Sequence, residues 1–336
     1  MINNFVLLTG GSGYIGSHTY IALKEKGFEP VIIDNLSNSF KSALENIKKI
    51  TGTDVIFENV DINDTEKIFK ILKNYNILNI IHLAAKKSVH ESYKKPIDYY
   101  NNNVGGLVSL IKAIETRNRK VNFLFSSSAC VYSTNNKIPF NENDKIFSEN
   151  PYGLSKIFCE KILNTLSSEI FNIGILRYFN PAGSHESGLL GQNEISNFTN
   201  LFSIIDNAAF RLINFVPVFG NDYKTKDGTC IRDYFHVMDL AEGHVSALNY
   251  LINEKKNFTL NLGNGNGFSV KEIILAYSEF NNLSIPFKIC KRRKGDLSIV
   301  ISSIDMARKK INWLPKYTLE DICTSSFVWK KKLLNR

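Results

Sequence analysis

Two polar residues one helical turn apart could together perform acid–base chemistry. Tyr152 and Lys156 lie in the segment PYGLSK, where Asn150 and Pro151 are suited to the cap and the first position of a helix. Both side chains should therefore project from one helix face. A phenol ordinarily keeps its proton to about pH 10, but a neighbouring ammonium group would favour the phenolate and make Tyr152 a usable base. Taken alone, the pair is equally typical of an ordinary amphipathic helix.

A glycine-rich turn near the start of the chain could bind a dinucleotide. The segment TGGSGYIG at 9–16 follows a predicted strand and opens a predicted helix at once. Gly10, Gly13 and Gly16 permit a tight turn and let backbone amides and the helix N-terminus approach a pyrophosphate. A glycine turn alone can be a mere strand–helix connection, but here the context is the one that the motif requires.

Two acids are suited to the adenosine half of the same cofactor. Asp34 ends the second predicted strand, at the distance where dinucleotide sites place an acid on the adenosine ribose. Its charge should repel a 2′-phosphate and so favour NAD over NADP. Asp61, after the third strand, is a candidate for contact with adenine, although an Asp at such a position is as readily a helix cap.

A serine cluster completes the set of reactive residues. Ser126, Ser127 and Ser128 close the fifth predicted strand, at the edge of the sheet where the nicotinamide should lie. A hydroxyl group there could share a substrate proton with Tyr152. Serines that end a strand are otherwise an ordinary turn signal, so this assignment depends on the two motifs above.

The elements that must position these residues follow from the hydrophobic pattern. Short apolar runs alternate with helical patterns through the first half of the chain, and we expect buried strands at 5–9, 31–34, 55–58, 80–83, 121–126 and 173–177. This alternation predicts an α/β fold, a doubly wound parallel sheet of the Rossmann type. The alternation is lost after Asn180. We expect an NAD-binding domain over 1–180 and a smaller α/β domain, mainly for the substrate, over 181–336, with part of 230–265 a candidate to return to the first.

Composition limits the possible partners and compartments. The chain has 41 basic and 32 acidic residues, a formal charge of +9, but the basic residues are scattered, so a solvated surface explains them better than nucleic-acid binding. Its five cysteines form no CxxC pair and are odd in number, and we expect no metal site and a reduced, cytoplasmic compartment. No secretory leader and no long apolar stretch is present, so we expect no membrane association.

The chain resembles the NAD-dependent extended short-chain dehydrogenases, and among them the UDP-galactose 4-epimerases, along essentially its whole length. The passages that carry the resemblance are TGGSGYIGSH at 9–18, DNLSNS at 34–39, KPIDYYNNNV at 95–104, SSSACVY at 126–132, PYGLSK at 151–156, LRYFNPAGSH at 176–185, FGNDYKTKDGTCIRDYFHVMDLAEGH at 219–244 and RRKGDL at 292–297. The glycine turn and the Tyr–Lys helix mark the superfamily, whereas the passage from FGNDY to HVMDLA points to the epimerases.

The resemblance implies a specific mechanism. Tyr152 would remove the proton from the sugar 4-hydroxyl while C4 gives hydride to NAD, Ser128 would hydrogen-bond that hydroxyl, and Lys156 would hold the nicotinamide ribose and lower the pKa of the phenol. The resulting 4-keto sugar would turn about its link to the diphosphate and take the hydride back on its other face. C4 would invert without net redox, and NAD would stay bound.

The resemblance also implies the binding residues. The positions that match NAD contacts are Gly10, Gly13, Tyr14, Ile15, Gly16, Asp34, Asn35, Leu36, Ser37, Asn38, Ser39, Asp61, Ile62, Leu83, Ala84, Ala85, Lys87, Asn102, Ser128, Tyr152, Lys156 and Phe179. The positions that match UDP-sugar contacts are Ser128, Tyr152, Tyr178, Asn180, Asn200, Leu201, Val216, Pro217, Val218, Phe219, Arg232, Tyr234, Arg293, Asp296 and Val300. Members of the family are commonly homodimers, here through helices at about 98–117 and 152–168.

Three departures and two alternatives accompany the resemblance. Phe198, Thr199, Asn200 and Leu201 stand where the family usually has Pro-Asn-Asn-Leu. Cys130 stands where the family usually has Thr, and Val300 stands where it has either Tyr or a small residue that gates the sugar pocket, so we expect N-acetylated UDP-hexosamines to enter as well. A sugar-nucleotide 4,6-dehydratase would need an acid beside Ser128, and the next two residues, Ala129 and Cys130, supply none. A non-catalytic cofactor-binding homologue is disfavoured because Ser128, Tyr152 and Lys156 occur together.

Overall fold

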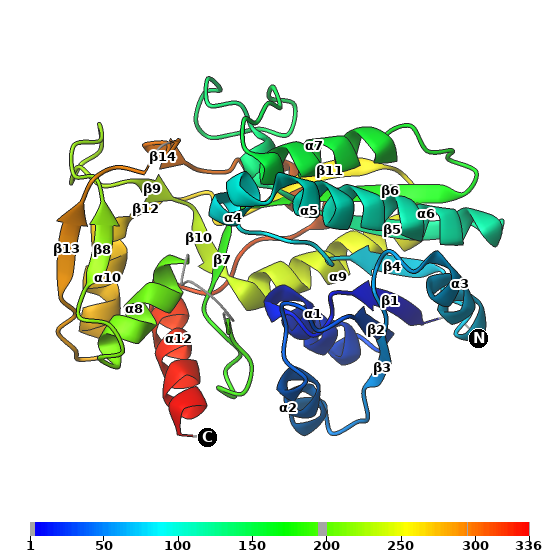
Figure 1. The fold of residues 1–336 in the computed structure, drawn as a ribbon, viewed down its shortest axis with the longest axis horizontal. Coiled ribbons are helices and arrows are strands. Elements are labelled where there is room, and N and C mark those ends of the chain that lie inside the picture. Colours follow the sequence, from blue (N-terminus) through cyan, green and yellow to red (C-terminus); the bar gives the residue numbers. More distant parts are fainter. Residues whose placement is uncertain (1–3, 194–199, 294, 336) are drawn as a thin grey trace.

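The fold is that of a computed structural model, which describes residues 4–193, 200–293 and 295–335. Its centre is a seven-stranded sheet with the order β11-β6-β5-β4-β1-β2-β3 (Figure 1). All neighbouring strands in this sheet are parallel. The strands are β1 (Phe5–Thr9), β2 (Glu29–Asp34), β3 (Ile56–Asn59), β4 (Asn79–His82), β5 (Val121–Ser128), β6 (Phe171–Tyr178) and β11 (Phe258–Leu262).

This order confirms the predicted doubly wound Rossmann-type sheet. The first six strands begin and end within two residues of their predicted bounds. The order reverses between β1 and β4, and in open α/β sheets ligands bind at such a switch point, beyond the carboxyl ends of the strands. The chain thus directs its site to one edge of the sheet.

Helices cover both faces of the sheet, which explains why its strands are nearly continuous apolar runs. Along β1, Val6 and Leu8 pack toward one face, and Leu7 packs toward the other. The first face is covered by α1 (Tyr14–Glu25), α2 (Ser42–Thr51) and α9 (Val237–Glu254), and the second by α3 (Thr65–Asn74), α6 (Gly106–Thr116) and α7 (Pro151–Leu163). Figure 1 shows α6 and α7 on one side of the sheet and α9 on the other.

Shorter helical segments connect these elements near the carboxyl edge. They are α4 (Val89–Lys94), α5 (Pro96–Tyr99), a π-helical segment η1 (Tyr100–Gly105) that runs into α6, and a 3₁₀ turn η2 (Ala129–Val131) directly after β5. π-helical turns are frequent at functional sites. Here the turn contains Asn102, one of the predicted cofactor residues.

A second region lies beyond the carboxyl edge and has its own apolar core. Its larger elements are α8 (Leu201–Ala209), β8 (Val216–Phe219), α10 (Val270–Phe280), β13 (Phe287–Cys290) and α12 (Leu319–Leu334), whereas α11 (Asp305–Ile311) packs into the core of the large sheet beside α9. Short strands join the two regions: β7 (Asn180–Ala182), β9 (Ile231–Arg232), β10 (Tyr234–His236), β12 (Phe268–Ser269) and β14 (Ile299–Val300). Between these segments the chain returns to the large sheet, because α9 packs on it and β11 pairs with β6.

None of the helices in the described ranges combines the length and the apolar character needed to cross a bilayer.

The placement of β11 at the edge of the large sheet generates a stability prediction. Leu260 on β11 is fully buried in the core, whereas Leu275 on α10 is 62% exposed. Leu260→Ala should lower the free energy of unfolding by about 2–5 kcal/mol, because it removes buried methyl groups and leaves a cavity. Leu275→Ala, the same chemical change, should cost far less. Urea unfolding of the two variants checks this, and equal small effects would contradict the placement of β11.

Candidate active site

The glycine turn leaves no room for side chains where it meets the sheet. Gly10 has a φ of +69°, and a Cβ atom there would lie 2.9 Å from the backbone of Ala84. A Cβ atom on Gly16 would collide with the carbonyl oxygen of Gly10. The helix α1 starts at Tyr14, and its cap, Gly13, has no side chain to occupy the first amide groups. These amides can therefore donate to an anion.

Asp34 ties the glycine turn to the loop after β2. Its carboxylate accepts hydrogen bonds from the amide of Ser12 at 3.2 Å and from the hydroxyl of Ser39 at 3.0 Å. The amide of Leu36, whose φ is +57°, donates to the same carboxylate at 2.9 Å. The predicted ribose acid thus also shapes the loop at 35–39 around itself.

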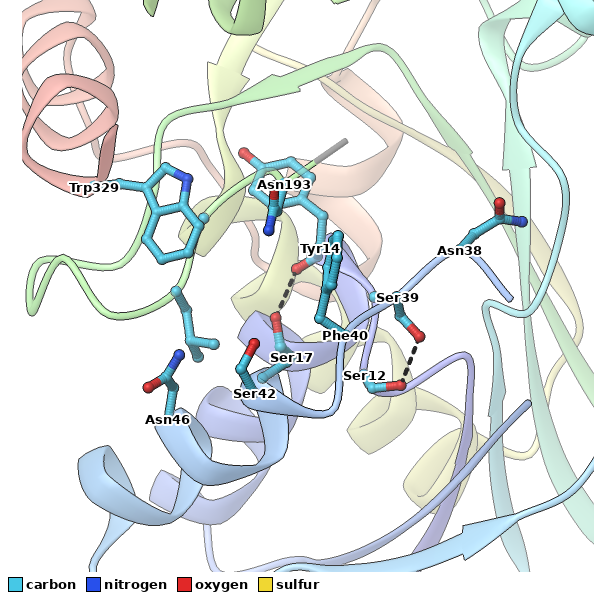
Figure 2. A pocket seen from close by; sticks show the side chains of 14 residues that line it. Ser12, Tyr14, Ser17, Asn38, Ser39, Phe40, Ser42, Asn46, Asn193 and Trp329 are labelled. Atoms are coloured by element: carbon cyan, nitrogen blue, oxygen red, sulfur yellow. Dashed lines mark hydrogen bonds between the residues drawn. The ribbon is translucent and has the colours of Figure 1, made fainter. Parts of the chain in front are cut away.

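A small, open pocket lies beside this turn, at the N-terminal ends of α1 and α2. Gly13, Tyr14, Asn38 and Ser39, which are predicted cofactor residues, line it. Figure 2 shows Trp329 lying across the pocket from Ser12 and Ser39. Sequence reasoning missed Trp329, because it comes from α12 at the far end of the chain and no spacing relates it to the glycine turn.

The predicted adenine residues lie next to one another at the ends of β2 and β3. Asn35 donates to the carboxylate of Asp61 at 2.7 Å, and the Asn63 amide donates to its other oxygen at 2.8 Å. Partial burial raises the pKa of Asp61, but these hydrogen bonds outweigh it and lower the pKa. Ile62 packs against Gly106 at the start of α6. The carboxylate is therefore fixed and ionised.

The segment after β4, which contains the predicted residues Leu83, Ala84, Ala85 and Lys87, is held by residues that sequence reasoning missed. The Thr9 hydroxyl accepts from the amides of Leu83 and Ala84, both at 3.1 Å. The Asn103 side chain accepts from the Lys86 amide at 2.8 Å and donates to the Ser155 hydroxyl of α7 at 3.0 Å. A signal for this was present: three consecutive asparagines, at 101–103, interrupt an otherwise helical stretch.

The predicted catalytic helix has the predicted cap. The Asn150 side chain accepts from the Gly153 amide at 2.7 Å, and Pro151 occupies the first turn. The Tyr152 phenol lies beside Ser128, the last residue of β5, close enough for the serine to lower the pKa of the phenol. Lys156 reaches deeper, where its ammonium group donates to the Ser126 carbonyl at 2.6 Å. The structure thus brings the three predicted catalytic side chains to one point at the carboxyl edge.

Burial opposes charge on both reactive groups. It raises the pKa of the Tyr152 phenol, the neighbouring Cys130 thiol adds to this, and only the hydrogen bond with Ser128 lowers it. Burial lowers the pKa of Lys156 to about 8, against the partial opposition of Cys159 and Glu160. The phenol therefore holds its proton until a positive charge is brought close to it, and Lys156 remains mainly cationic at neutral pH.

Three predicted substrate residues of the second region form a charged group. Arg293 donates to Asp296 at 2.8 Å, and Arg232 lies 3.8 Å from the other oxygen of that carboxylate. The Arg293 guanidinium lies 4.8 Å from the ring centre of Phe219. The strand β14 aligns Val300 with Arg232 in parallel register. Two guanidinium groups beside one carboxylate suit a diphosphate next to a hydroxylated group.

Two residues connect this group to the rest of the site. Burial raises the pKa of Cys130, whereas the Ser128 hydrogen bond and the charge of Arg232 lower it, and the same thiol raises the pKa of Tyr152. The pKa of Tyr234 is raised by burial to about 12, while Arg232 and Arg293 oppose the rise. Through Cys130 and Tyr234, the predicted catalytic residues and the predicted substrate residues thus lie within electrostatic reach of one another.

Other predicted ligand residues are buried or make contacts within the protein. The Tyr178 phenol lies 2.5 Å from the ring of His244 on α9. Val216 and Val218 are fully buried, so only their backbone can meet a ligand, whereas Pro217 and Phe219 are half-buried. Backbone amides hold Phe179 to Leu262 and Asn180 to Asp233, both at 3.0 Å, and the Asn200 side chain caps α8, which begins at Leu201.

No group of three or more His, Cys, Asp or Glu side chains suited to a metal ion occurs within the described residues.

Residues 7–326 match the family model for GDP-mannose 4,6 dehydratase. The UDP-glucose 4-epimerase of Dictyostelium discoideum is 40% identical over 332 residues, 98% of this chain and 96% of that protein. The UDP-glucose-4-epimerase of Stenotrophomonas maltophila, solved with NAD and formylated UDP-arabinopyranose, superposes with a TM-score of 0.96 at 37% identity and covers 99% of both chains. That of Bifidobacterium longum, solved with NAD+ and UDP, gives 0.93 at 40% identity, over 98% of this chain and 99% of that one.

The burial of Lys156 generates a prediction about stability against pH. Its pKa falls from 10.5 in the unfolded chain to about 8 in the folded protein, so between these values the unfolded chain binds more protons at this site. Stability therefore rises with pH in this window, by as much as about 1.4 kcal/mol per unit, and Lys156→Met should remove that rise. Chemical unfolding of the cofactor-free protein at pH 7.5 to 10 measures it. Lys161→Met, exposed on the same helix, should keep the wild-type slope, and an unchanged slope in Lys156→Met would refute the burial of a titrating ammonium group.

Proposed function

We propose that this chain, which belongs to the UDP-glucose 4-epimerase family of the extended short-chain dehydrogenases, interconverts UDP-galactose and UDP-glucose at C4 with bound NAD. One observation carries the proposal. Tyr152 and Lys156 of α7 both lie against the end of β5, at the carboxyl edge from which the glycine turn follows β1, and Arg232, Arg293 and Asp296 form a charged group in the second region. A redox cofactor and a nucleotide sugar can thus meet at one acid–base pair.

The residues of the first region fit NAD. The open amides at the start of α1 would bind the pyrophosphate, and the fixed Asp34 carboxylate would accept from the adenosine ribose hydroxyls and disfavour a 2′-phosphate. The loop at 35–39, Asp61 and Ile62 would surround the adenosine, and the segment at 83–87, Asn102 and Phe179 would line the nicotinamide half. Bound there, NAD would take a hydride from C4 of the sugar and return it.

Tyr152 exchanges the proton of the sugar 4-hydroxyl. Its phenol must become a phenolate, and burial opposes this, so the positive charge of Lys156 and of the oxidised nicotinamide would supply the missing stabilisation. Ser128 would donate to the same sugar oxygen and fix its direction. The proton returns from Tyr152 to the oxygen after the sugar has presented its other face, so no base from solvent is required.

The second region binds the uridine diphosphate. Arg232 and Arg293 would pair with diphosphate oxygens, and Asp296 would accept from a ribose hydroxyl. Tyr178, Asn180, Asn200, Leu201 and Tyr234, with the backbone of β8, would complete the wall around the sugar and uracil. Because Ala129 and Cys130 follow Ser128, the acid that a 4,6-dehydratase needs beside this serine is missing from that position.

We further propose a cytoplasmic homodimer. Five free cysteines suit a reducing compartment. The proposed interface helices carry exposed apolar side chains: Ile97 is 74% exposed and Phe158 is 43% exposed, and the Phe158 ring lies 6.1 Å from that of Tyr100. Pairing of two such surfaces would bury them.

The assignment of Tyr152 is tested by removing a single oxygen. Tyr152→Phe should lower the turnover of UDP-galactose to UDP-glucose by roughly 10²- to 10⁴-fold while UDP still binds, because the ring and the charged group of the second region remain. Product formation without net NADH accumulation is the measurement. Tyr93→Phe makes the same change at a residue that is 59% exposed and should be neutral. Full activity of Tyr152→Phe would show that another group moves the proton.

The sugar range is tested at Val300. Valine beside Arg232 on β14 leaves more space than tyrosine would, so the wild-type protein should epimerise UDP-N-acetylglucosamine as well as UDP-glucose. Val300→Tyr should lose at least tenfold in turnover of the acetylated sugar and keep turnover of the plain hexose, since a blocked pocket rejects only the larger group. A wild-type protein active on UDP-galactose and inactive on the acetylated sugar would contradict this gate.

A further inference from the structure

Three buried polar side chains form a row across the sheet, one residue before the site. Ser127 of β5, Arg177 of β6 and Asn261 of β11 are register partners on adjacent strands. Register partners project from the same face of a sheet and lie side by side. None of them is more than 5% exposed. The row lies on the face that α7 covers, directly before the ends of β5 and β6.

Glu160 of α7 packs against this row and contacts Ser127 and Arg177. Arg177 donates to both of its oxygens, Nε to Oε1 at 3.0 Å and Nη2 to Oε2 at 2.7 Å, and the Ser127 hydroxyl donates to Oε1 at 2.5 Å. Burial lowers the pKa of the Arg177 guanidinium, but Glu160 outweighs it and raises the pKa, so the pair is ionic. A bidentate guanidinium–carboxylate pair fixes direction as well as distance.

The remaining donor of Arg177 is also engaged. Its Nη1 donates to the Tyr132 hydroxyl at 3.0 Å and to the Glu142 carbonyl at 2.9 Å. The Tyr132 hydroxyl in turn donates to the side-chain oxygen of Asn261 at 2.6 Å. The backbone amide of Asn261 donates to the Glu142 carboxylate at 2.9 Å. The network thus joins α7, three strands and the loop after η2 into one hydrogen-bonded unit.

The spacing along α7 relates this unit to the reactive groups. Tyr152, Lys156 and Glu160 are four residues apart and share one helix face. Each meets a different serine at the end of β5: Tyr152 meets Ser128, Lys156 meets the carbonyl of Ser126, and Glu160 meets the hydroxyl of Ser127. Only the third contact is locked by a bidentate ion pair.

We propose that Arg177 and Glu160 are positioning residues, which fix the rotation and the axial position of α7 so that the Tyr152 phenol and the Lys156 ammonium group stay opposite the end of β5. This inference rests on the proposed function for its kinetic readout. A buried ion pair adds little to stability over a well-packed apolar pair, but breaking it on one side leaves a buried charge. Its geometric role and its stabilising role can therefore be separated by experiment.

The decisive variant replaces the whole pair. Glu160→Leu combined with Arg177→Met removes both charges at similar volume, so the protein should stay folded with its melting temperature within a few degrees of wild type. KM and the content of bound NAD should change less than about threefold, and kcat should fall by about 10²-fold, because displacement of a catalytic group by about 1 Å costs that much. A stable double variant with wild-type kcat would overturn the proposal.

Two further measurements keep the test decisive. If the double variant does not fold, Glu160→Gln, which keeps the shape and loses the charge, should lower kcat at least tenfold with KM held, and a change in KM alone would overturn the inference. Tyr277→Phe is the matched control: it removes a buried hydrogen bond to Asp206, 2.5 Å long, in the second region, and should lower stability without lowering kcat.

The failure of this inference is distinguishable from failure of the proposed function. Inactivity of the wild-type protein on UDP-galactose would contradict the proposed function and would leave the positioning role untouched. Amide hydrogen exchange then serves as the readout: the amides of α7 should exchange faster in the double variant while those of α10 stay unchanged. Equal protection of α7 in wild type and double variant would overturn the positioning role.

Discussion

A parallel sheet that is covered on both faces leaves one place for polar chemistry, the carboxyl edge of its strands. Polar groups buried near that edge lose their contacts with water, so each must find a partner in the protein. The residues that do so are shared between neighbouring elements: Thr9 serves the segment after β4, Asp34 serves the glycine turn and its neighbouring loop, and Asn103 connects α7 to Lys86. The hydrogen bonds that satisfy these buried polar groups therefore also hold the segments of the site in place.

The reactive groups are the exceptions, because their chemistry requires charge where burial opposes it. Lys156 is 3% exposed, with a depressed pKa, and stays cationic near neutrality beside a carbonyl oxygen and the face of Phe125. The Tyr152 phenol is held neutral by the same burial. Burial thus disfavours the charged form of each group: a nearby positive charge would stabilise the Tyr152 phenolate, and a polar oxygen would stabilise the Lys156 ammonium group. Functional sites commonly contain such destabilised groups, which lower the stability of the protein.

Periodicity and local motifs predicted much of this structure, since strands, the glycine turn, the capped helix and the serine cluster are each encoded in a few consecutive residues. The residues that were missed depend on distant partners. Arg177 sits in an apolar strand and Glu160 on a helix, and each has an ordinary local context; only the packing of α7 against β6 shows that they meet. The position of β11 itself follows from a chain that leaves the sheet and returns. The domain boundary at 180, the individual ligand contacts and the homodimer stay predictions.

Asp233 shows how the two regions are kept in register without an ion pair. It is fully buried, and among the described residues no cationic side chain pairs with it. Its carboxylate instead accepts from the amides of Asn264, Gly265 and Ser302 and from the Ser302 hydroxyl. An asparagine would turn an NH₂ group toward some of these donors, so only an acceptor-only group satisfies all of them. Because Asp233 follows Arg232 and its carbonyl accepts from Asn180, it joins β14 and the anion-binding arginine to the end of the large sheet. The placement of β14 and Arg232 relative to the end of the large sheet is therefore set by the buried Asp233 carboxylate and by backbone hydrogen bonds.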